Sequence, residues 1–220
     1  MRTHHVPGRV LTLINLVLLC SNPATWAGDG LVALQTADSS CPDDSGAIYV
    51  DCGNGTVTDN RTGLVWLKNA NCIGSAGGGA GSPLGKVDWF TAMEFVAGLS
   101  DDPSRDAAAD DCGLSDGSSP GEWRLPSRPE WEVMIADGVA LGCTSSGFGG
   151  PSITDDSGLQ CWQEGPGNSF SGVVSFFYWS AGTRIQFPTN AWVLSLNGGF
   201  VASGDKGSSD AYVWSVRGGQ

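Results

Sequence analysis

Histidine, the usual general base of hydrolytic enzymes, is confined to the extreme N-terminus of this chain. The two histidines are His4 and His5, and both lie in a segment that we predict to be removed on export. Without them the sequence has no Ser-His-Asp triad, no Cys-His pair and no histidine-ligated zinc or iron site. We therefore predict that the protein is not an enzyme. A hydrolase that uses a pair of carboxylates is the one enzymatic alternative that the residue types leave open.

Aspartate is the most abundant side chain that could bind a cation. The chain has 18 Asp and 5 Glu, and many aspartates cluster in segments rich in Gly and Ser. Oxygen ligands at flexible positions suit Ca²⁺. The segment nearest to a calcium loop is DCGNGTVTD (residues 51–59), but Gly53 stands there in place of an oxygen ligand. We predict no metal site and assign the aspartates to acidic turns, so that calcium is the only cofactor left open.

Six cysteines follow the export segment, and their even number predicts disulfide bonds. They are Cys41, Cys52, Cys72, Cys112, Cys143 and Cys161. No CxxC pair is present, which argues against a thiolate metal site or a thioredoxin-like role. Six cysteines allow fifteen connectivities. We favour pairing of neighbours, 41–52, 72–112 and 143–161, because each bond would close one loop rich in Gly, Ser and Asp; a 41–52 pair that stays reduced or pairs differently is the alternative.

Tryptophan supplies most of the candidates for ligand binding, because an indole face stacks well on a sugar ring. The candidate ligand-binding residues are Trp162, Trp179, Arg184 and Asn190, in or beside the segments 142–172 and 181–190. The other six tryptophans downstream of the export segment lie in apolar patterns, and we expect them in the core. These six are Trp66, Trp89, Trp123, Trp131, Trp192 and Trp214.

Two arginines stand among apolar residues, Arg124 after Trp123 and Arg217 after Val216. A guanidinium in such surroundings needs acceptors, so we expect each to hold backbone carbonyls or a carboxylate such as Glu130 or Asp59. Capture of an anionic ligand is the alternative role.

The elements that must position these side chains follow an α+β order. Strands are expected at 47–51, 55–58, 64–67, 174–180, 191–196, 200–202 and 211–217, with hairpin turns at Asn54-Gly55 and at residues 197–199. One helix is expected from Trp89 to about Leu99, capped by Asp88. A second begins with the capping box of Ser127 and Glu130 and runs to about residue 136. Loop-rich insertions are expected at 100–120 and 142–172.

The N-terminus predicts export. Residues 1–27 combine two arginines, a short apolar run (10–20) and small residues at 25 and 27, as a signal peptide does. Residues 28–46 form a lead-in and 47–220 one domain. Without Arg2 and Arg9, 9 Lys+Arg face 23 Asp+Glu, a net charge of −14. We therefore expect no nucleic-acid partner and no membrane insertion after signal removal. The expected location is the periplasm, the cell surface or the medium. The oligomeric state stays open.

Five sequence segments that contain Trp or Arg occur in a characteristic order: DNRTGLVWLKNANC (59–72), GEWRLPSRPEW (121–131), YWS (178–180), NAWVLSLNGG (190–199) and YVWSVRGGQ (212–220). They resemble the bacterial family typified by the C-terminal domain of a collagen-like adhesin, the Lcl C-terminal domain, and more distantly the C-type-lectin and formylglycine-generating-enzyme folds. The resemblance implies a C-type-lectin-like α+β fold, with a small twisted antiparallel sheet, two helices, and N- and C-terminal strands that pair. The enzyme's reactive cysteine pair has no counterpart, because no cysteine follows Cys161.

The resemblance also implies a role in adhesion. We expect a non-catalytic binding module that recognises a protein or glycan through loops 142–172 and 181–190. The adhesin relative suggests polyanion binding, but the strong negative charge argues against it. A structural cell-envelope protein without a small ligand is the alternative.

Overall fold

The computed structural model describes residues 41, 46–75, 85–102, 112–144 and 150–219. These residues belong to the compact unit Gln35–Gln220. The expected signal segment 1–27, most of the lead-in 28–46 and parts of both insertions lie outside the described residues. Within the described part of the chain, none of the helices has the length and apolar character that crossing a bilayer requires.

Four strands form the first sheet, in the spatial order β1-β2-β3-β7 with every pair antiparallel. They are β1 (Tyr49–Asp51), β2 (Thr56–Asp59), β3 (Leu64–Leu67) and β7 (Val216–Arg217). The turn between β1 and β2 contains the expected Asn54-Gly55. Gly55 has a φ of 84°, and a Cβ there would lie 2.3 Å from the Gly113 carbonyl oxygen. Glycine is therefore required at this turn, both for its backbone angle and for the close approach of a distant segment.

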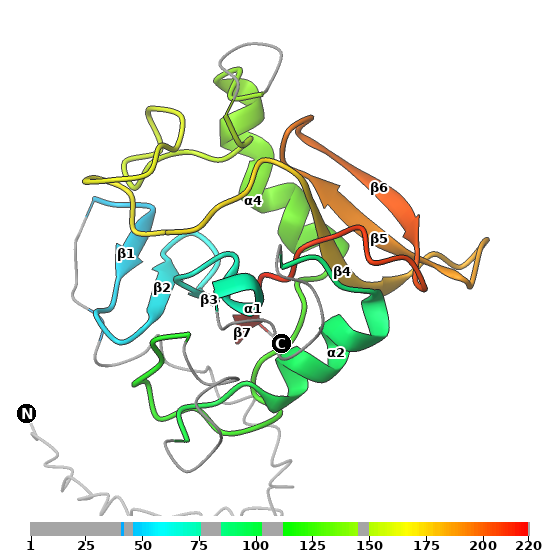
Figure 1. Ribbon diagram of the computed structural model, residues 1–220. Helices are drawn as coiled ribbons and strands as arrows, with labels where there is room; N and C mark the ends of the chain where they lie inside the picture. The colour runs from blue at the N-terminus through cyan, green and yellow to red at the C-terminus, as the bar shows by residue number, and fades with distance from the viewer. Residues whose placement is uncertain (1–40, 42–45, 76–84, 103–111, 145–149, 220) are drawn as a thin grey trace, which may run out of the picture. The chain divides into compact units, whose positions relative to one another are not determined.

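Three strands form the second sheet, in the order β4-β5-β6, again antiparallel. They are β4 (Phe177–Thr183), β5 (Asn190–Ser195) and β6 (Phe200–Asp205). The register of β4 against β5 shifts between Trp179 and Thr183. In this interval Ala181 donates its amide to the Pro126 carbonyl instead, so β4 bends and leaves a long hairpin that projects from the sheet (Figure 1).

The described helices are α1 (Cys72–Ser75), α2 (Trp89–Gly98) and α4 (Arg128–Ala140). Asp88 caps α2, and Ser127 with Glu130 forms a complete capping box on α4, as expected. The expected end of α4 near residue 136 was wrong, since the helix continues for another turn. Gly138 allows this because a Cβ there would lie 2.4 Å from the Ser152 carbonyl oxygen, so the last turn packs directly on the 152–153 backbone.

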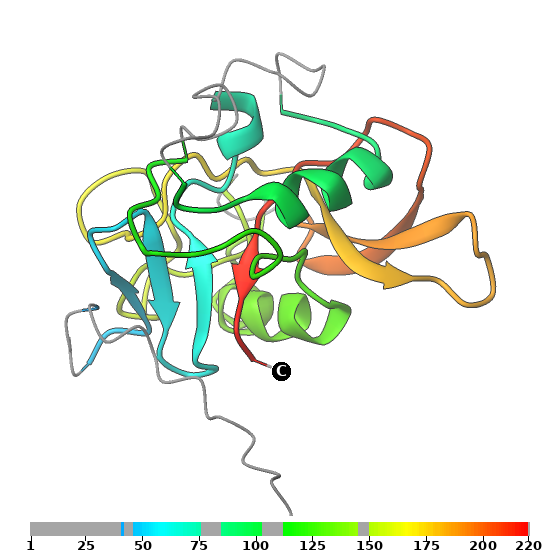
Figure 2. The same ribbon diagram turned by 90° about the horizontal axis from the view of Figure 1, so that it is seen from below.

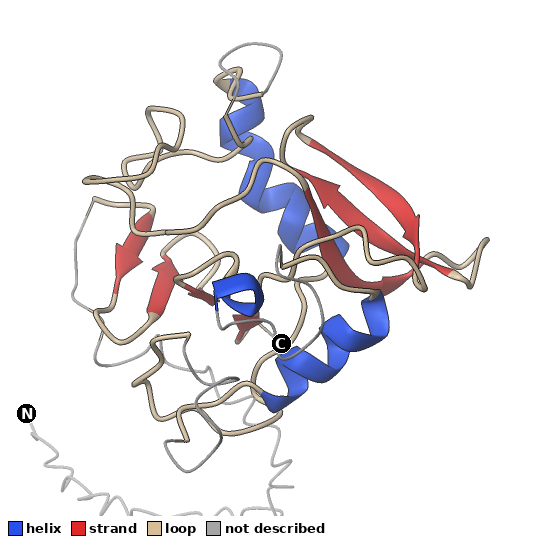
Figure 3. Cartoon of the chain, in the orientation of Figure 1, coloured by secondary structure: helices blue, strands red, loops and turns tan. Residues whose placement is uncertain are grey.

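The two helices α2 and α4 cover opposite faces of the second sheet (Figures 2 and 3). Ala92 and Val96 of α2 share a core cluster with Ala191 and Val193 of β5. Leu194, which points to the other side of β5, shares a second cluster with residues of α4. Alternation along β5 therefore supplies one apolar row to each helix.

The expectation of one small sheet was wrong, because the described strands form two sheets. The segment 211–217, expected as a single strand, connects them. Tyr212 bridges to Tyr178 of the second sheet, and Val216 pairs with Trp66 of the first. The C-terminal strand β7 thus pairs with β3 and not with the first strand. The stretch between the two contacts has no continuous partner strand, which is why only two residues are regular β-structure.

An aromatic cluster fills the space where the two sheets meet. Trp66, Trp131, Trp214 and Tyr178 lie with ring centres 5.2–6.0 Å apart. Trp214 donates its indole N–H to the Leu67 carbonyl and Trp131 donates to the Trp179 carbonyl. Each buried indole therefore adds apolar contact and also fixes the position of a strand.

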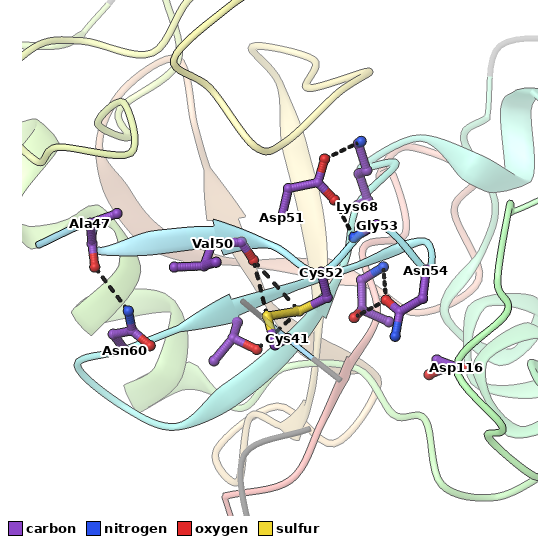
Figure 4. The surroundings of a disulfide bond; sticks show 12 residues. Cys41, Ala47, Val50, Asp51, Cys52, Gly53, Asn54, Asn60, Lys68 and Asp116 are labelled. Carbon is purple, nitrogen blue, oxygen red and sulfur yellow. Dashed lines mark hydrogen bonds and ion pairs between the residues drawn. A yellow bond between two sulfur atoms is a disulfide. The ribbon is translucent and has the colours of Figure 1, made fainter. Parts of the chain in front are cut away.

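All three expected disulfides are confirmed: Cys41–Cys52, Cys72–Cys112 and Cys143–Cys161. The first lies against β1, where both sulfur atoms are near the Val50 carbonyl (Figure 4). The second joins α1 to the segment that contacts the β1–β2 turn. The third joins the chain after α4 to the loop 150–172. Three such bonds are typical of proteins from oxidising compartments.

Candidate functional site

The burial of the tryptophans differs from the sequence-based expectation. Trp66, Trp123, Trp131 and Trp214 are buried, as expected, but Trp89 and Trp192 are only partly covered. The two indoles proposed as ligand platforms, Trp162 and Trp179, are instead buried. This burial argues against the predicted role of these two residues as stacking platforms, since neither ring has a free face.

Trp162 is turned inward by its neighbours along the chain. Its amide donates to the Ile153 carbonyl, and Thr154 forms a bridge with Cys161. The loop is thus a short hairpin tied to α4 through Cys143–Cys161, and the Trp162 ring joins the main core cluster. Trp179 is held on the other side of the core, where its indole N–H donates to the Val87 carbonyl across 2.8 Å.

The other two candidates, Arg184 and Asn190, lie together at the two ends of the loop that connects β4 and β5. The Arg184 amide donates to the Asn190 carbonyl, and the Phe187 carbonyl accepts from the Asn190 amide. These bonds fold residues 184–190 into a compact tip. Ile185 is 87% exposed and Phe187 is 54% exposed at this tip, so the hairpin exposes two large apolar side chains to solvent.

A row of alternating rings and guanidinium groups runs from the hairpin tip to the start of α4. The Arg184 guanidinium carbon lies 4.5 Å from the Phe187 ring centre and 5.8 Å from that of Trp192. The Arg128 guanidinium carbon lies 4.4 Å from the Trp192 ring centre. These contacts fall within the range of cation–π attraction. We call the surface formed by Arg128, Arg184, Ile185, Phe187 and Trp192 the hairpin face.

The position of the hairpin face follows from the bend in β4 and the start of α4. Arg128 stands in the first turn of α4 and pairs with Glu132, across 2.7 Å. Arg184 donates to the Ser203 hydroxyl on β6, across 2.9 Å. The face is therefore held by one helix and by the second sheet.

A second aromatic group lies at the same end of the sheet. The Lys206 ammonium lies 4.3 Å from the Trp89 ring centre and donates to the Thr183 hydroxyl. Trp89 donates its indole N–H to the Ser180 carbonyl, and Phe90 beside it is 61% exposed. The end of the sheet therefore carries aromatic and cationic side chains on both sides.

The cations at this end stand out in a chain with 23 acidic and 11 basic side chains. Carboxylates pair with most other described cations, as Glu130 does with Arg124 and Asp116 with Arg217. Among the described residues, Arg184 and Lys206 have no carboxylate within ion-pair distance. Two cations at the hairpin end therefore lack a direct carboxylate partner within this part of the molecule.

The two loops expected to share one binding face do not come together. Ile48, next to β1, donates its amide to the Asp156 carbonyl, so the loop 150–172 lies beside the first sheet. The 184–190 hairpin projects from the far end of the second sheet, and both views separate the two (Figures 1 and 2). Leu159 is 77% exposed in the 150–172 loop, but it is isolated from the hairpin face.

The aspartates near the 150–172 loop act mainly on the backbone. Asp155 accepts from the amides of Leu159 and Gln160, and Asp156 accepts from the amide and hydroxyl of Ser169. Asp51 pairs with Lys68 (Figure 4). In the described ranges, no group of three His, Cys, Asp or Glu residues is arranged to hold a metal ion.

Arg124 has the structural contacts that were expected of it. It forms two hydrogen bonds with Glu130, of 2.6 and 2.8 Å, and a third with the Gly218 carbonyl. This guanidinium thus joins the start of α4 to the C-terminal strand. Arg217 contacts Asp116, at 3.0 Å, and stacks over Trp123.

Of the residues in the hairpin face, the sequence analysis named Arg184 as a candidate but not Trp192 or Arg128. Trp192 sits in an apolar strand, and nothing local to it shows that its ring is only partly covered. Its contact with Arg128 joins residues that are far apart in the chain.

Comparison with known proteins gives one match. The sequence model described as the Lcl C-terminal domain matches residues 55–217, well over half of the 220-residue chain. The matched range contains the whole hairpin face. No curated protein matches the chain, and no solved structure does.

Proposed function

The chain belongs to the Lcl C-terminal domain family, and from this we propose that it is an exported, non-catalytic adhesion module that binds a partner through the hairpin face. The family suggests an adhesin-associated role. The main supporting observation is the row Phe187–Arg184–Trp192–Arg128, together with the exposed Ile185 next to Arg184 in the chain. Aromatic residues and arginine are the side chains most enriched at the energetic centres of protein interfaces.

A protein partner fits this face better than a glycan does. Stacking on a sugar needs an open ring face, but Arg128 covers the Trp192 ring and Lys206 covers the Trp89 ring. The other described tryptophans are buried. Exposed Ile185 and Phe187 suit an apolar pocket on a protein. A glycan that hydrogen-bonds the guanidinium groups is the second candidate.

A C-type-lectin-like fold agrees with this reading. Support comes from the α+β architecture, the two helices that flank antiparallel strands and the disulfide-tied loops. In such a layout an exposed hairpin on a rigid support is a natural place for recognition. Residues 1–27 would direct the chain to the periplasm, the cell surface or the medium, where its disulfides are stable.

The test is a binding screen that is followed by single substitutions. Purified protein is offered to a peptide-display library and to a printed glycan array, and the affinity of each selected ligand is measured by calorimetry. Phe187→Ala and Ile185→Ala should each weaken binding at least tenfold, because each removes a large exposed anchor, while the melting temperature changes little.

Leu159→Ala is the matched control, because it removes an equally exposed aliphatic side chain from the loop beside the first sheet. It should leave the affinity unchanged. Loss of binding with Leu159→Ala but not with Phe187→Ala would move the site to the 150–172 loop. Robust hydrolysis of an offered glycan that depends on one carboxylate would overturn the non-catalytic assignment.

A further inference from the structure

Helix α4 carries apolar side chains on its solvent side as well as on its core side, beside the charged side chains of Glu132 and Asp137. Its core side carries Trp131, Met134, Ile135 and Gly138. On the opposite side Val133 is 44% exposed and Val139 is 41% exposed, and Ala136 and Ala140 on the same side are also exposed. A surface helix of a monomer usually carries polar residues there. The solvent side of α4 is therefore composed like a contact surface.

The residues on this side are spaced symmetrically about Ala136. Val133 and Val139 lie three positions before and after it, and Glu132 and Ala140 lie four before and after it. At about 100° per residue, all five fall on one half of the helix. A surface with this symmetry is complementary to itself when a second helix lies antiparallel on it, since Val133 then meets Val139 of the other copy.

The small residue at the centre allows the two helices to approach closely. Alanine at the crossing point removes the side-chain bulk that would otherwise separate the helix axes, and interaxial distances near 8 Å need such a residue. An antiparallel arrangement also places the N-terminal turn of one helix beside the C-terminal turn of the other, so that their dipoles attract.

For reasons of charge, a second copy can approach this face more easily than most of the remaining surface. The chain has a formal net charge of −12, so two copies repel wherever acidic surfaces meet. Along α4, however, Glu132 is paired with Arg128 and Asp137 with Arg61. The solvent side of α4 is thus nearly neutral, and two copies can approach there at little electrostatic cost.

The apolar surface continues beyond the helix onto the β5–β6 turn. A Cβ on Gly199 would lie 2.6 Å from Cγ2 of Val139, so the turn touches the helix. Phe200, the next residue, is 52% exposed. We propose that two copies of this protein associate through α4, antiparallel about Ala136, with Phe200 of each copy at the margin of the contact. A helix pair of this size makes a small interface, so the dimer is weak and depends on concentration.

The proposal is tested on the purified exported form, without the expected signal segment 1–27, by sedimentation equilibrium up to about 1 mM, a range suited to small interfaces. The wild type should associate reversibly into dimers, and added salt should strengthen association because it screens the net charge. Ala136→Glu and Ala136→Lys each place like charges against each other at the symmetry axis. Each variant alone should associate at least tenfold more weakly, and an equimolar mixture should recover a heterodimer.

Recovery in the mixture is specific to a contact in which residue 136 meets itself, and a folding defect cannot produce it. Circular dichroism checks that both variants stay folded, as expected for an exposed helical site. Leu159→Glu and Ile185→Glu are matched controls that should leave the dimer intact. A wild type that stays monomeric up to about 1 mM, or a mixture that fails to associate, overturns the proposal. Dissociation by Ile185→Glu would assign self-association to the hairpin face instead.

Discussion

Glu130 combines two tasks in one side chain. Its carboxylate accepts the Ser127 amide, at 2.6 Å, which completes the N-terminal cap of α4. The same carboxylate binds the Arg124 guanidinium, which also holds the Gly218 carbonyl. Burial alone would raise the pKa of Glu130, but the hydrogen bonds from Arg124 and Ser127 outweigh it and lower the pKa. The ionised form is therefore the one that the fold stabilises.

Glu130→Gln should destabilise the protein by about 1.5–3 kcal/mol at pH 7, the range for hydrogen bonds to a charged group. The folded pKa of Glu130 lies below its unfolded value, so its contribution is fully present above the unfolded pKa, near 4.3, and is lost as the pH falls through the folded pKa. The difference in unfolding free energy between wild type and variant should shrink below about pH 4. Urea titrations at several pH values measure it, and a constant difference would contradict the assignment.

Asp156 shows the opposite behaviour. Burial is the largest cause that raises its pKa; the amide and hydroxyl of Ser169 oppose this, and the charges of Asp155 and Asp51 add to the rise. A raised folded pKa means that the fold favours the protonated carboxyl, so stability falls as the pH rises from the unfolded pKa through the folded one.

Asp156→Asn should therefore be as stable as the wild type at pH 7 or more so, because the amide oxygen can still accept from Ser169. This advantage should disappear below about pH 4, where the wild-type carboxyl is protonated as well. Asp210→Asn, which removes the same charge from an exposed site, is the control for net charge. A clear loss of stability in Asp156→Asn at neutral pH would show that the charge itself is required.

At the scale of elements, local patterns predicted where structure begins better than where it ends. The Ser127–Glu130 box and the Asp88 cap set the starts of α4 and α2 because capping depends on residues four or fewer apart. The end of α4 was not predictable, since it depends on Gly138 packing against Ser152. The bend in β4 likewise depends on Pro126, some fifty positions away in the sequence.

The Cys143–Cys161 bond should be an independent stabiliser of its loop. It closes a stretch with a sequence separation of 18, and chain entropy for such a loop corresponds to about 3 kcal/mol. The double substitution Cys143→Ala/Cys161→Ala should lower the unfolding free energy by about that amount and leave binding at the hairpin face unchanged. Thermal and urea unfolding measure the first effect, and the affinity of a selected ligand measures the second. Loss of binding together with stability would mean that the loop and the hairpin are coupled.

At the scale of the whole molecule, the α+β class and the disulfide pairing could be predicted, while the division into two sheets and the site could not. The α+β class follows from the order of the expected strands and helices, and the disulfide pairing follows from the order of the cysteines along the chain. Whether Trp162 or Trp192 is exposed depends on which helix covers which strand, and both residues look alike in the sequence. The strand 211–217 was recognised, but its switch from one sheet to the other is set by Tyr178 and Trp66, which are far apart in the chain.

The aromatic cluster at the junction should make the two sheets unfold together. Trp214 lies between the segments that contact each sheet, and its ring touches Trp66, Trp131 and Tyr178. Trp214→Ala should cost about 3–5 kcal/mol, as expected for a buried aromatic, and amide exchange should accelerate equally in β2 and in β5. Trp192→Ala, at the partly covered hairpin face, should cost much less and leave exchange in β2 unchanged. If amide exchange in Trp214→Ala accelerates only in β2 and its neighbours, the second sheet is stable by itself. The junction would then hold the two sheets together without making them fold as one unit.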